Sequence, residues 1–509
     1  MGTPAEDLIA RWLSSGRARV TPDGSIALAE RQGLALLQKL RRAYDWIADA
    51  ALTTPFDDIE LGPARAVGRG ARPLQVHDGR AWCSFVLLPL LALVTKQRVL
   101  IVGGPGRGKT SVATLMAMLA GHEPAEVRRA VQRGHPQLTV SDLLGAPLPS
   151  ELIKATASEG VRVAWRRWLT MRVKVIDEYN RIPTKTQSAL LSLMAEGCAE
   201  VFEQVIETGP SSWYLTANDD LGGGTFEVIE ALRDRVDVVV RCAPYSGRLL
   251  EALADRVGQG RGPEATIPRD IVLTPAELER AEAEVRAVPV PPDVLDALGF
   301  FAGQLDFCGR ASQRLEFKNK DTLHVAGRRV AQVCTEDCPL DKTENLCSQT
   351  EAGVSARAYQ SLLLMAKALA WFRGEPAVSL PDVRALLPWA LHEKVRPNAQ
   401  SGFFLKSENR VLLTDRVSWF HHMFDHAMTQ RAAYARAREP VERARLALVD
   451  LPRMTDAQVE RHAESLRAQM VTLSQMGELN APVHADLLLL KSLHGRCQRA
   501  LSERREGRG

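Results

Sequence analysis

The sequence predicts an α/β fold: a parallel-sheet core sandwiched by helices, followed by an all-helical lid and a C-terminal helical region. From Val76 to about Cys242, short apolar runs rich in β-branched residues alternate with helical segments. This alternation is typical of a parallel sheet covered on both faces. From Thr274 onward the strand pattern nearly disappears. Near the start of the alternating region, a glycine-rich loop joins a strand to a helix, and such a junction is where open α/β sheets hold ligands.

Bulk composition is ordinary for a globular protein of several domains. The chain has 509 residues, 45% hydrophobic and 25% charged, and a net charge of +4, which predicts neither nucleic acid nor membrane as a partner. Met1 to Asp7 lack a basic and apolar leader pattern, and Phe85 to Val94 is about half of the length that spans a bilayer. We therefore expect a cytoplasmic protein whose eight cysteines are reduced or bound to metal rather than paired as disulfides.

Changes in pattern along the chain predict four parts. Thr274 and Thr455 each begin a capping box, the signature of a helix start, and the second is followed by apolar residues at heptad-like spacing, a turn and a Leu-rich helix. This predicts a helical hairpin packed on its own chain, with an intermolecular coiled coil as the alternative. The expected parts are an N-terminal helical region (1–75, with a Gly/Arg/Pro-rich linker at 62–73), the α/β core (76–245), a helical lid (246–400, with an insertion at about 307–351) and a C-terminal helical region (401–509).

The glycine-rich loop has the spacing of a phosphate-binding loop. Gly103 to Thr110 fits G-x-x-x-x-G-K-[ST], with an apolar strand before it and a helix after it. The loop would turn backbone N–H groups toward phosphates, Lys109 would reach the β- and γ-phosphates of ATP, and Thr110 would ligate Mg²⁺. The expected nucleotide-binding residues are Gly103, Gly104, Pro105, Gly106, Arg107, Gly108, Lys109, Thr110 and Ser111.

Two later strands end in polar residues suited to hydrolysis. Asp177 and Glu178 follow the apolar run Val173 to Ile176, and Asn218 follows the next strand, Ser212 to Ala217. Because the carboxyl ends of parallel strands share one edge of a sheet, these side chains should meet the phosphate loop. Asp177 would hold the Mg²⁺ shell, Glu178 would polarise the attacking water, and Asn218 would orient that water.

Three arginines are candidates to neutralise charge on the transferred phosphoryl group. Arg233 and Arg235 precede the next apolar strand, and either would act when it is supplied by a neighbouring subunit. Arg357 begins a helix in the all-helical part and would reach the γ-phosphate from a lid. A surface arginine in a local ion pair, for example with Asp234, is the competing interpretation.

Taken together, these pieces resemble the AAA+ ATPases, and within them the MoxR branch. The resemblance extends beyond the ATP motifs and covers about Val76 to Val395 without the cysteine segment. Asp177 to Leu191 is similar to the family's D-E-I-N-R-A-P-P-K-T-Q-S-A-L-L string. The other segments that resemble the branch are Leu138–Gly145, Val201–Thr208, Val272–Leu278, Val288–Val290, Ser355–Ala358 and Ser379–Val383.

The resemblance implies roles for these residues. Lys109 and Thr110 would be the Walker A pair, Asp177 and Glu178 the Walker B acids and Asn218 the first sensor. Arg235 would be the arginine finger, which Arg233 would share, and Arg357 the second sensor. The chain departs from the family at Arg107 (usually Thr), at Arg233 to Val236 (usually L-D-R-F) and at Ala356 (usually Pro), and none of these changes removes a catalytic group.

The resemblance also implies an assembly and a task. Family members form rings, usually hexamers, that bind ATP between subunits and remodel or activate a protein client, often with a partner that carries a von Willebrand A domain. Several help to load metal cofactors into enzymes. Two alternatives remain: an AAA+ ATPase that acts on nucleic acid, which the acidic strip Glu200 to Glu207 disfavours, and a non-hydrolysing ATP-binding scaffold.

Four of the eight cysteines fall in the segment that replaces a short family connector. A loop of this length without its own structure is uncommon in a compact domain, and a metal held by four thiolates would supply the missing core. The spacing gives only one C-x₃-C pair, which is unusual for zinc, and Pro339 follows one cysteine as in some iron–sulfur motifs. A 4Fe–4S cluster, Zn²⁺ and no metal remain open. The candidate ligands are Cys308, Cys334, Cys338 and Cys347.

Overall fold

The computed structural model describes most of the chain. The described residues are 18–20, 26–28, 30–52, 54–68, 74–154, 161–218, 230–244, 247, 249–260, 262–334 and 338–506. Internal contacts divide the chain into two compact units: the first comprises Met1–Pro289 and Gln360–Leu386, and the second comprises Val290–Tyr359 and Leu387–Gly509. The expected boundaries at residues 75, 245 and 400 remain predictions, because these two units divide the chain at other positions.

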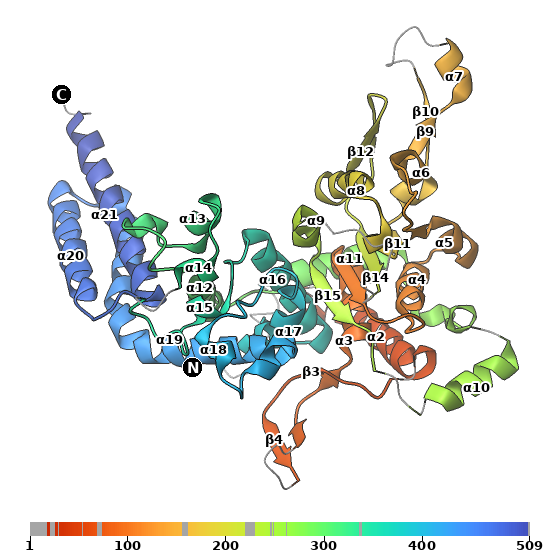
Figure 1. Ribbon diagram of the computed structural model, residues 1–509, viewed down its shortest axis with the longest axis horizontal. Helices are drawn as coiled ribbons and strands as arrows, with labels where there is room; N and C mark the ends of the chain where they lie inside the picture. The colour runs from red at the N-terminus through yellow and green to blue at the C-terminus, as the bar shows by residue number, and fades with distance from the viewer. Residues whose placement is uncertain are drawn as a thin grey trace. The chain divides into compact units, whose positions relative to one another are not determined.

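A five-stranded parallel sheet forms the core of the first unit (Figure 1). In parallel pairing, Leu100 of β7, the second strand of the sheet, lies opposite Leu215 on one side and Val239 on the other. Because all five strands run the same way, their carboxyl ends share one edge. Across the sheet the strands are β15 (Val238–Arg241), β7 (Arg98–Val102), β14 (Ser212–Ala217), β11 (Val173–Asp177) and β8 (Gln132–Arg133).

Helices cover both faces of this sheet. On one face, Leu100, Ile176 and Leu215 pack in a cluster with side chains of η3, α8 and α9. On the other face lie α3 and α4, and the buried Tyr214 hydroxyl donates to the Pro89 carbonyl of α3 at 2.8 Å. The helices of this unit are α2 (Glu30–Trp46), η1 (Ile47–Ala51), α3 (Ser84–Thr95), α4 (Lys109–Leu119), α5 (Pro124–Ala130), α6 (Val140–Leu144), α7 (Pro149–Lys154), η3 (Arg167–Thr170), η4 (Tyr179–Arg181), α8 (Thr184–Glu196), α9 (Glu230–Arg235), α10 (Leu249–Gln259), η5 (Pro263–Ala265), η6 (Arg269–Ile271), α11 (Pro275–Ala287) and most of α16 (Ala356–Arg373) and α17 (Leu380–Ala390).

The described part of the N-terminal region is not helical throughout, as had been expected for 1–75. It includes the long helix α2 but also short strands, and residues 64–67 of the expected linker at 62–73 form one strand of a hairpin. Period-2 sequence patterns that are too short to stand out explain the miss. The strands outside the parallel sheet pair antiparallel as β1 (Ala18–Val20) with β2 (Ile26–Leu28), β3 (Ile59–Glu60) with β6 (Ala81–Trp82), β4 (Ala64–Val67) with β5 (Leu74–His77), β9 (Gly145–Pro147) with β10 (Val163–Trp165) and β12 (Cys198–Val201) with β13 (Gln204–Glu207).

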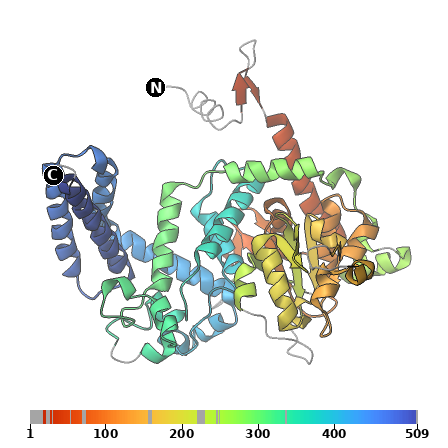
Figure 2. The same ribbon diagram turned by 90° about the horizontal axis from the view of Figure 1, so that it is seen from above.

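The second unit is helical, as expected. Its long helices pair into the predicted hairpin of α20 and α21, which lie side by side (Figure 2) and bury Leu466, Leu490 and Leu493 in one cluster. The Thr455 hydroxyl accepts from the Gln458 N–H, which confirms the capping box. The helices are α12 (Pro292–Asp306), η7 (Leu315–Phe317), α13 (Lys320–Val325), α14 (Val330–Val333), α15 (Leu346–Gln349), α18 (Gly402–Leu405), η8 (Arg410–Leu413), α19 (Arg416–Ala447), η9 (Leu448–Arg453), α20 (Asp456–Ser474) and α21 (Ala481–Glu506).

Among the described helices, none combines the length and the apolar character needed to cross a membrane. The most apolar of them, α3, is instead buried along its whole length.

A buried ion pair joins the amino-terminal ends of β7 and β15. Asp237, 2% exposed, accepts from the Arg98 guanidinium at 2.7 and 3.0 Å, and also from the Ser361 hydroxyl. We expect Asp237→Ala to cost about 3–5 kcal/mol, because it leaves a largely buried guanidinium without its carboxylate. A lower urea midpoint in fluorescence-monitored unfolding checks this. Asp270→Ala, in a pair with Arg42 that is more than half exposed, is the control and should cost less than about 1 kcal/mol. Equal decreases of the urea midpoint in the two variants would contradict the prediction.

Candidate functional site

The loop between β7 and α4 has the backbone that the phosphate-loop motif requires. Gly106 (φ 71°) and Gly108 (φ 79°) lie in the left-handed region, which glycine adopts without strain. Gly103 passes so close to β15 that a Cβ there would lie 2.8 Å from the Cys242 sulfur. Arg107, where the family usually has Thr, is exposed. The loop therefore needs its glycines for shape, and α4 begins directly after it at Lys109.

The ammonium group of Lys109 lies across the loop. The residue is 6% exposed, and its Nζ donates to the carbonyls of Gly103 (2.6 Å) and Gly104 (2.8 Å) and to the Asn218 amide oxygen (2.7 Å). All three acceptors are neutral oxygens. Phosphate oxygens are stronger, charged acceptors for an ammonium group, so this position suits the binding of a polyphosphate.

The Asp177 carboxylate links the loop helix to the sheet. Its Oδ1 accepts from the Thr110 hydroxyl at 2.8 Å and from the Thr216 hydroxyl at 2.6 Å. Thr110 is the second residue of α4, and Thr216 is a fully buried residue of β14. A hydroxyl and a carboxylate side by side form the oxygen-rich environment that Mg²⁺ prefers, so these residues fit the expected magnesium site.

Glu178 adopts a left-handed conformation that aims its side chain at Asn218. Its φ is 54°, its N–H donates to the Thr216 hydroxyl at 2.9 Å, and its Oε1 accepts from the Asn218 amide at 2.8 Å. Arg181 lies 3.4 Å from the other carboxylate oxygen. A non-glycine residue in this region is strained, and such strain is often retained where a side chain must be held for function.

The structure thus brings together five of the eight predicted catalytic residues: Lys109, Thr110, Asp177, Glu178 and Asn218. Arg233 and Arg235 lie on α9 with partly buried side chains, and Arg357 lies in the first turn of α16 among the residues of the second unit. Their roles toward a nucleotide remain predictions.

Thr216 and Gly134 are supporting residues that the sequence analysis missed. Thr216 holds both acids, and a Cβ at Gly134 would lie 2.1 Å from the Glu178 carbonyl, so only glycine fits beside the strained turn. The role of Thr216 could have been predicted from the sequence, because it is a polar residue two positions before Asn218 in an apolar strand. The role of Gly134 could not, since its neighbour in the fold, Glu178, is distant in sequence.

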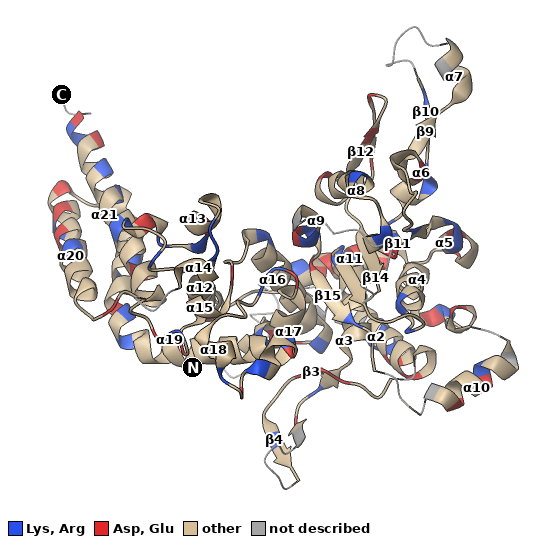
Figure 3. Ribbon diagram, in the orientation of Figure 1, with Lys and Arg blue, Asp and Glu red and all other residues tan. Residues whose placement is uncertain are grey.

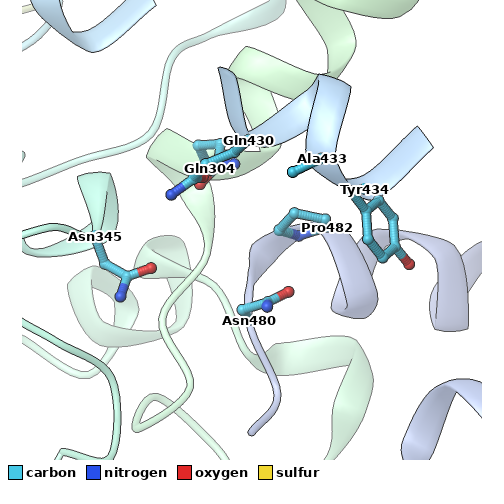
Figure 4. Close-up of a pocket in the computed structure, with 7 residues that line it drawn as sticks. All are labelled: Gln304, Asn345, Gln430, Ala433, Tyr434, Asn480 and Pro482. Atoms are coloured by element: carbon cyan, nitrogen blue, oxygen red, sulfur yellow. Dashed lines mark hydrogen bonds between the residues drawn. The ribbon is translucent and has the colours of Figure 1, made fainter. Parts of the chain in front are cut away.

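The second unit holds a pocket of different character (Figure 4). Amide side chains line much of it: Gln304, Asn345, Gln430 and Asn480, with Gln304 donating to Gln430 at 2.7 Å. Its lining includes no charged side chain. A triphosphate needs cationic or N–H donors in number, so this pocket does not suit one.

All four candidate metal ligands, Cys308, Cys334, Cys338 and Cys347, belong to the second unit. Burial raises the pKa of the Cys347 thiol to about 12. Among the described residues, no three or more Cys, His, Asp or Glu side chains are placed to hold a single metal ion. Among these residues the structure therefore gives no support to a preformed metal site, whether for zinc or for an iron–sulfur cluster.

Comparison with known proteins agrees with the geometry. Residues 98–238 match the family described as "ATPase family associated with various cellular activities (AAA)", and residues 343–411 match the AAA lid domain. A solved structure from Cytophaga hutchinsonii, described as that of a candidate ATPase, is similar in fold, with a TM-score of 0.51 and 16% identity over 78% of this chain and 97% of that chain. No protein of curated function matches the sequence.

We expect Thr216→Val to slow triphosphate turnover by about 10–100-fold, because residues that orient ligands of a metal have effects of this size. The change keeps the side-chain shape but removes the hydroxyl that holds Asp177 and Glu178. Steady-state phosphate release measures it. Thr95→Val removes another buried hydroxyl, which bonds to the Leu91 carbonyl at 2.9 Å, and should leave turnover unchanged. Equal losses in both variants would mean that the effect is one of general stability.

Proposed function

We propose that this chain, an AAA+ ATPase, works as a MoxR-like motor that couples ATP hydrolysis to remodelling or activation of a protein client. One observation carries the proposal: the chain segment that leaves the site at Glu178 returns to it at Asn218, and between them it carries an exposed hairpin. The AAA core and lid matches support ATP hydrolysis, and the hairpin supports the coupling.

For hydrolysis, each side chain has a task that follows from its position. Lys109 would exchange its neutral acceptors for phosphate oxygens, and Thr110 and Asp177 would hold Mg²⁺, which would supply positive charge next to the phosphates. Glu178 accepts a proton from the attacking water, and Asn218 orients both Glu178 and that water. The Asn218 amide bridges Lys109 and Glu178, at 2.7 and 2.8 Å, so it senses both the phosphate-binding and the hydrolytic side of the site.

The segment from Glu178 to Asn218 connects this chemistry to the surface. It runs through η4 and α8 into the β12–β13 hairpin and returns along β14, whose last residues reach the site. The two ends of the segment meet in one hydrogen bond, between Glu178 and Asn218. The presence or absence of the γ-phosphate would therefore change the contacts of both ends together. We assign the transmission of this change to the hairpin, because its tip residue Phe202 is exposed.

The hairpin tip presents apolar surface in a strained turn. Phe202 (51% exposed) and Glu203 are its two central residues, with φ of 51° and 60°. Turns of this type favour Asn-Gly, and each non-glycine residue costs about 1–3 kcal/mol. Val205 is 60% exposed beside them. Ile153, 86% exposed, belongs to α7, which projects to the same side of the core as the hairpin (Figure 1).

The chemistry of the hairpin favours a protein client over nucleic acid. Glu200, Glu203 and Glu207 are exposed along it, and the hairpin is acidic in Figure 3. Acidic side chains repel a phosphate backbone, whereas exposed Phe202 and Val205 can bind apolar segments of a protein.

The assembly part of the proposal concerns the three arginines. In a homo-oligomeric ring, most simply a hexamer, Arg235 of one subunit, with Arg233 beside it, would complete the site of the next, and Arg357 would act from the lid. A partner with a von Willebrand A domain would deliver the client, and the cytoplasm would be the compartment.

We expect Glu178→Gln to bind ATP but to hydrolyse it at least about 100-fold more slowly, because it loses the general base while keeping the Asn218 contact. Turnover and retained nucleotide measure this, and co-purification with the trapped variant identifies the client. A scaffold that does not hydrolyse ATP would show the same nucleotide retention and partners for wild type and variant, and this outcome would refute the motor.

A second prediction separates coupling from chemistry. Phe202→Ser removes the apolar tip without touching the site, so we expect basal ATP turnover to stay within about twofold while stimulation by the client is lost. Client-stimulated phosphate release is the measurement. Phe317→Ser, an exposed phenylalanine of the second unit (49%), is the control. Stimulation that persists in Phe202→Ser would rule the hairpin out as the client contact.

A further inference from the structure

We propose that Arg181 is a positioning residue that restrains Glu178, so that the site hydrolyses ATP below its full rate until the β12–β13 hairpin moves. This inference rests on the proposed function, since it takes Glu178 to be the general base. Three features of the structure support it: the two contacts of the Glu178 carboxylate, the exposed position of Arg181, and the hydrogen bonds that connect Arg181 to the hairpin through α8.

Both oxygens of the Glu178 carboxylate have a partner. Oε1 accepts from the Asn218 amide at 2.8 Å, and Oε2 lies 3.4 Å from the Nε of Arg181. A cation beside a carboxylate stabilises its charged form, and this opposes the transfer of a proton to it. A general base must take a proton from water, so Arg181 in this position weakens Glu178 as a base. The neutral amide of Asn218 exerts no such charge effect.

The contact between Arg181 and Glu178 is of a kind that opens easily. Their side chains are 39% and 34% exposed, and water and salt screen such a pair. The ion pair between Arg98 and Asp237, by contrast, is largely buried and has hydrogen bonds of 2.7 and 3.0 Å. A permanent support of the base would resemble the second pair, whereas a restraint that has to be released resembles the first.

Hydrogen bonds connect Arg181 to the hairpin through α8. Gln187 of α8 is fully buried, and its side-chain amide donates at 2.9 Å to the carbonyl of Ile182, the residue that follows Arg181. At the other end of α8, the Gly197 carbonyl accepts from the N–H of Thr208 at 2.7 Å and from its hydroxyl at 3.0 Å. Thr208 directly follows β13 of the hairpin. Displacement of the hairpin would therefore move α8, and α8 would move the backbone beside Arg181.

Arg181→Gln removes the cation and keeps a polar side chain. We expect single-turnover hydrolysis of ATP to become about two- to fivefold faster, which is the factor that an exposed ion pair contributes. Enzyme in excess over ATP excludes product release from this measurement, and the KM for ATP should stay within about twofold, because the contact concerns the base and not binding. Arg181→Lys keeps a cation and should hydrolyse ATP at the wild-type rate. A purely structural role would lower the rate.

Arg280→Gln is the matched control. Arg280 and Glu284 of α11 form an ion pair of similar exposure, 36% and 29%, and its loss should leave the rate unchanged. The difference between Arg181→Gln and wild type should also shrink as the salt concentration rises, because salt screens the wild-type pair. An unchanged or slower rate in Arg181→Gln, or an equal increase in Arg280→Gln, would overturn the proposal. Wild-type turnover in Glu178→Gln would instead refute the proposed function, whatever the result for Arg181.

The connection to the hairpin is tested with the protein that co-purifies with Glu178→Gln. Its stimulation of phosphate release should be smaller in Arg181→Gln than in wild type, by the factor by which the basal rate is higher, because the restraint is already absent. Phosphate release with and without this protein measures the two factors. Equal stimulation of both chains would show that the hairpin does not act through Arg181, and would overturn the release that we propose.

Discussion

The hydrogen bonds that the Asp177 carboxylate accepts from Thr110 and Thr216 are the constraint on which the rest of the ATPase site depends. They join the helix after the phosphate loop to two neighbouring strands, so the position of the loop is set by the sheet. Thr216 extends the same link to the backbone N–H of Glu178, which holds the strained turn that aims this carboxylate at Asn218. One short chain of hydroxyl groups on rigid elements therefore positions the side chains to which we assign phosphate binding, magnesium binding and activation of water.

The same chain of hydrogen bonds suggests how a change at the nucleotide site would reach the exposed hairpin tip. Of the four described non-glycine residues with a left-handed backbone, three lie on the segment that leaves and re-enters the site: Glu178, Phe202 and Glu203. The fourth, Lys96, caps the end of α3. Strain of this kind persists only when the surrounding contacts hold it in place. In the motor that we propose, nucleotide turnover changes those contacts at one end, and the apolar tip moves at the other.

Much of this site could be predicted from the sequence, because its residues occur in short patterns with direct physical meaning. Gly103 to Thr110 specifies a loop, and an apolar strand that ends in Asp177 and Glu178 places acids at the edge where the loop lies. Contacts between segments that are distant in sequence were harder to predict. Gly134 beside Glu178 and the strands of the N-terminal region could not be predicted, since nothing local marks them.

The central claim is that one chain binds the triphosphate and a second chain completes the site with Arg235. The most direct test mixes two inactive variants, Lys109→Ala and Arg235→Ala, and measures ATP turnover. In a mixed ring, some sites combine the intact Lys109 of one subunit with the intact Arg235 of its neighbour, so the account predicts that activity reappears on mixing. A mixture as inactive as its two components, while still assembled, would contradict it.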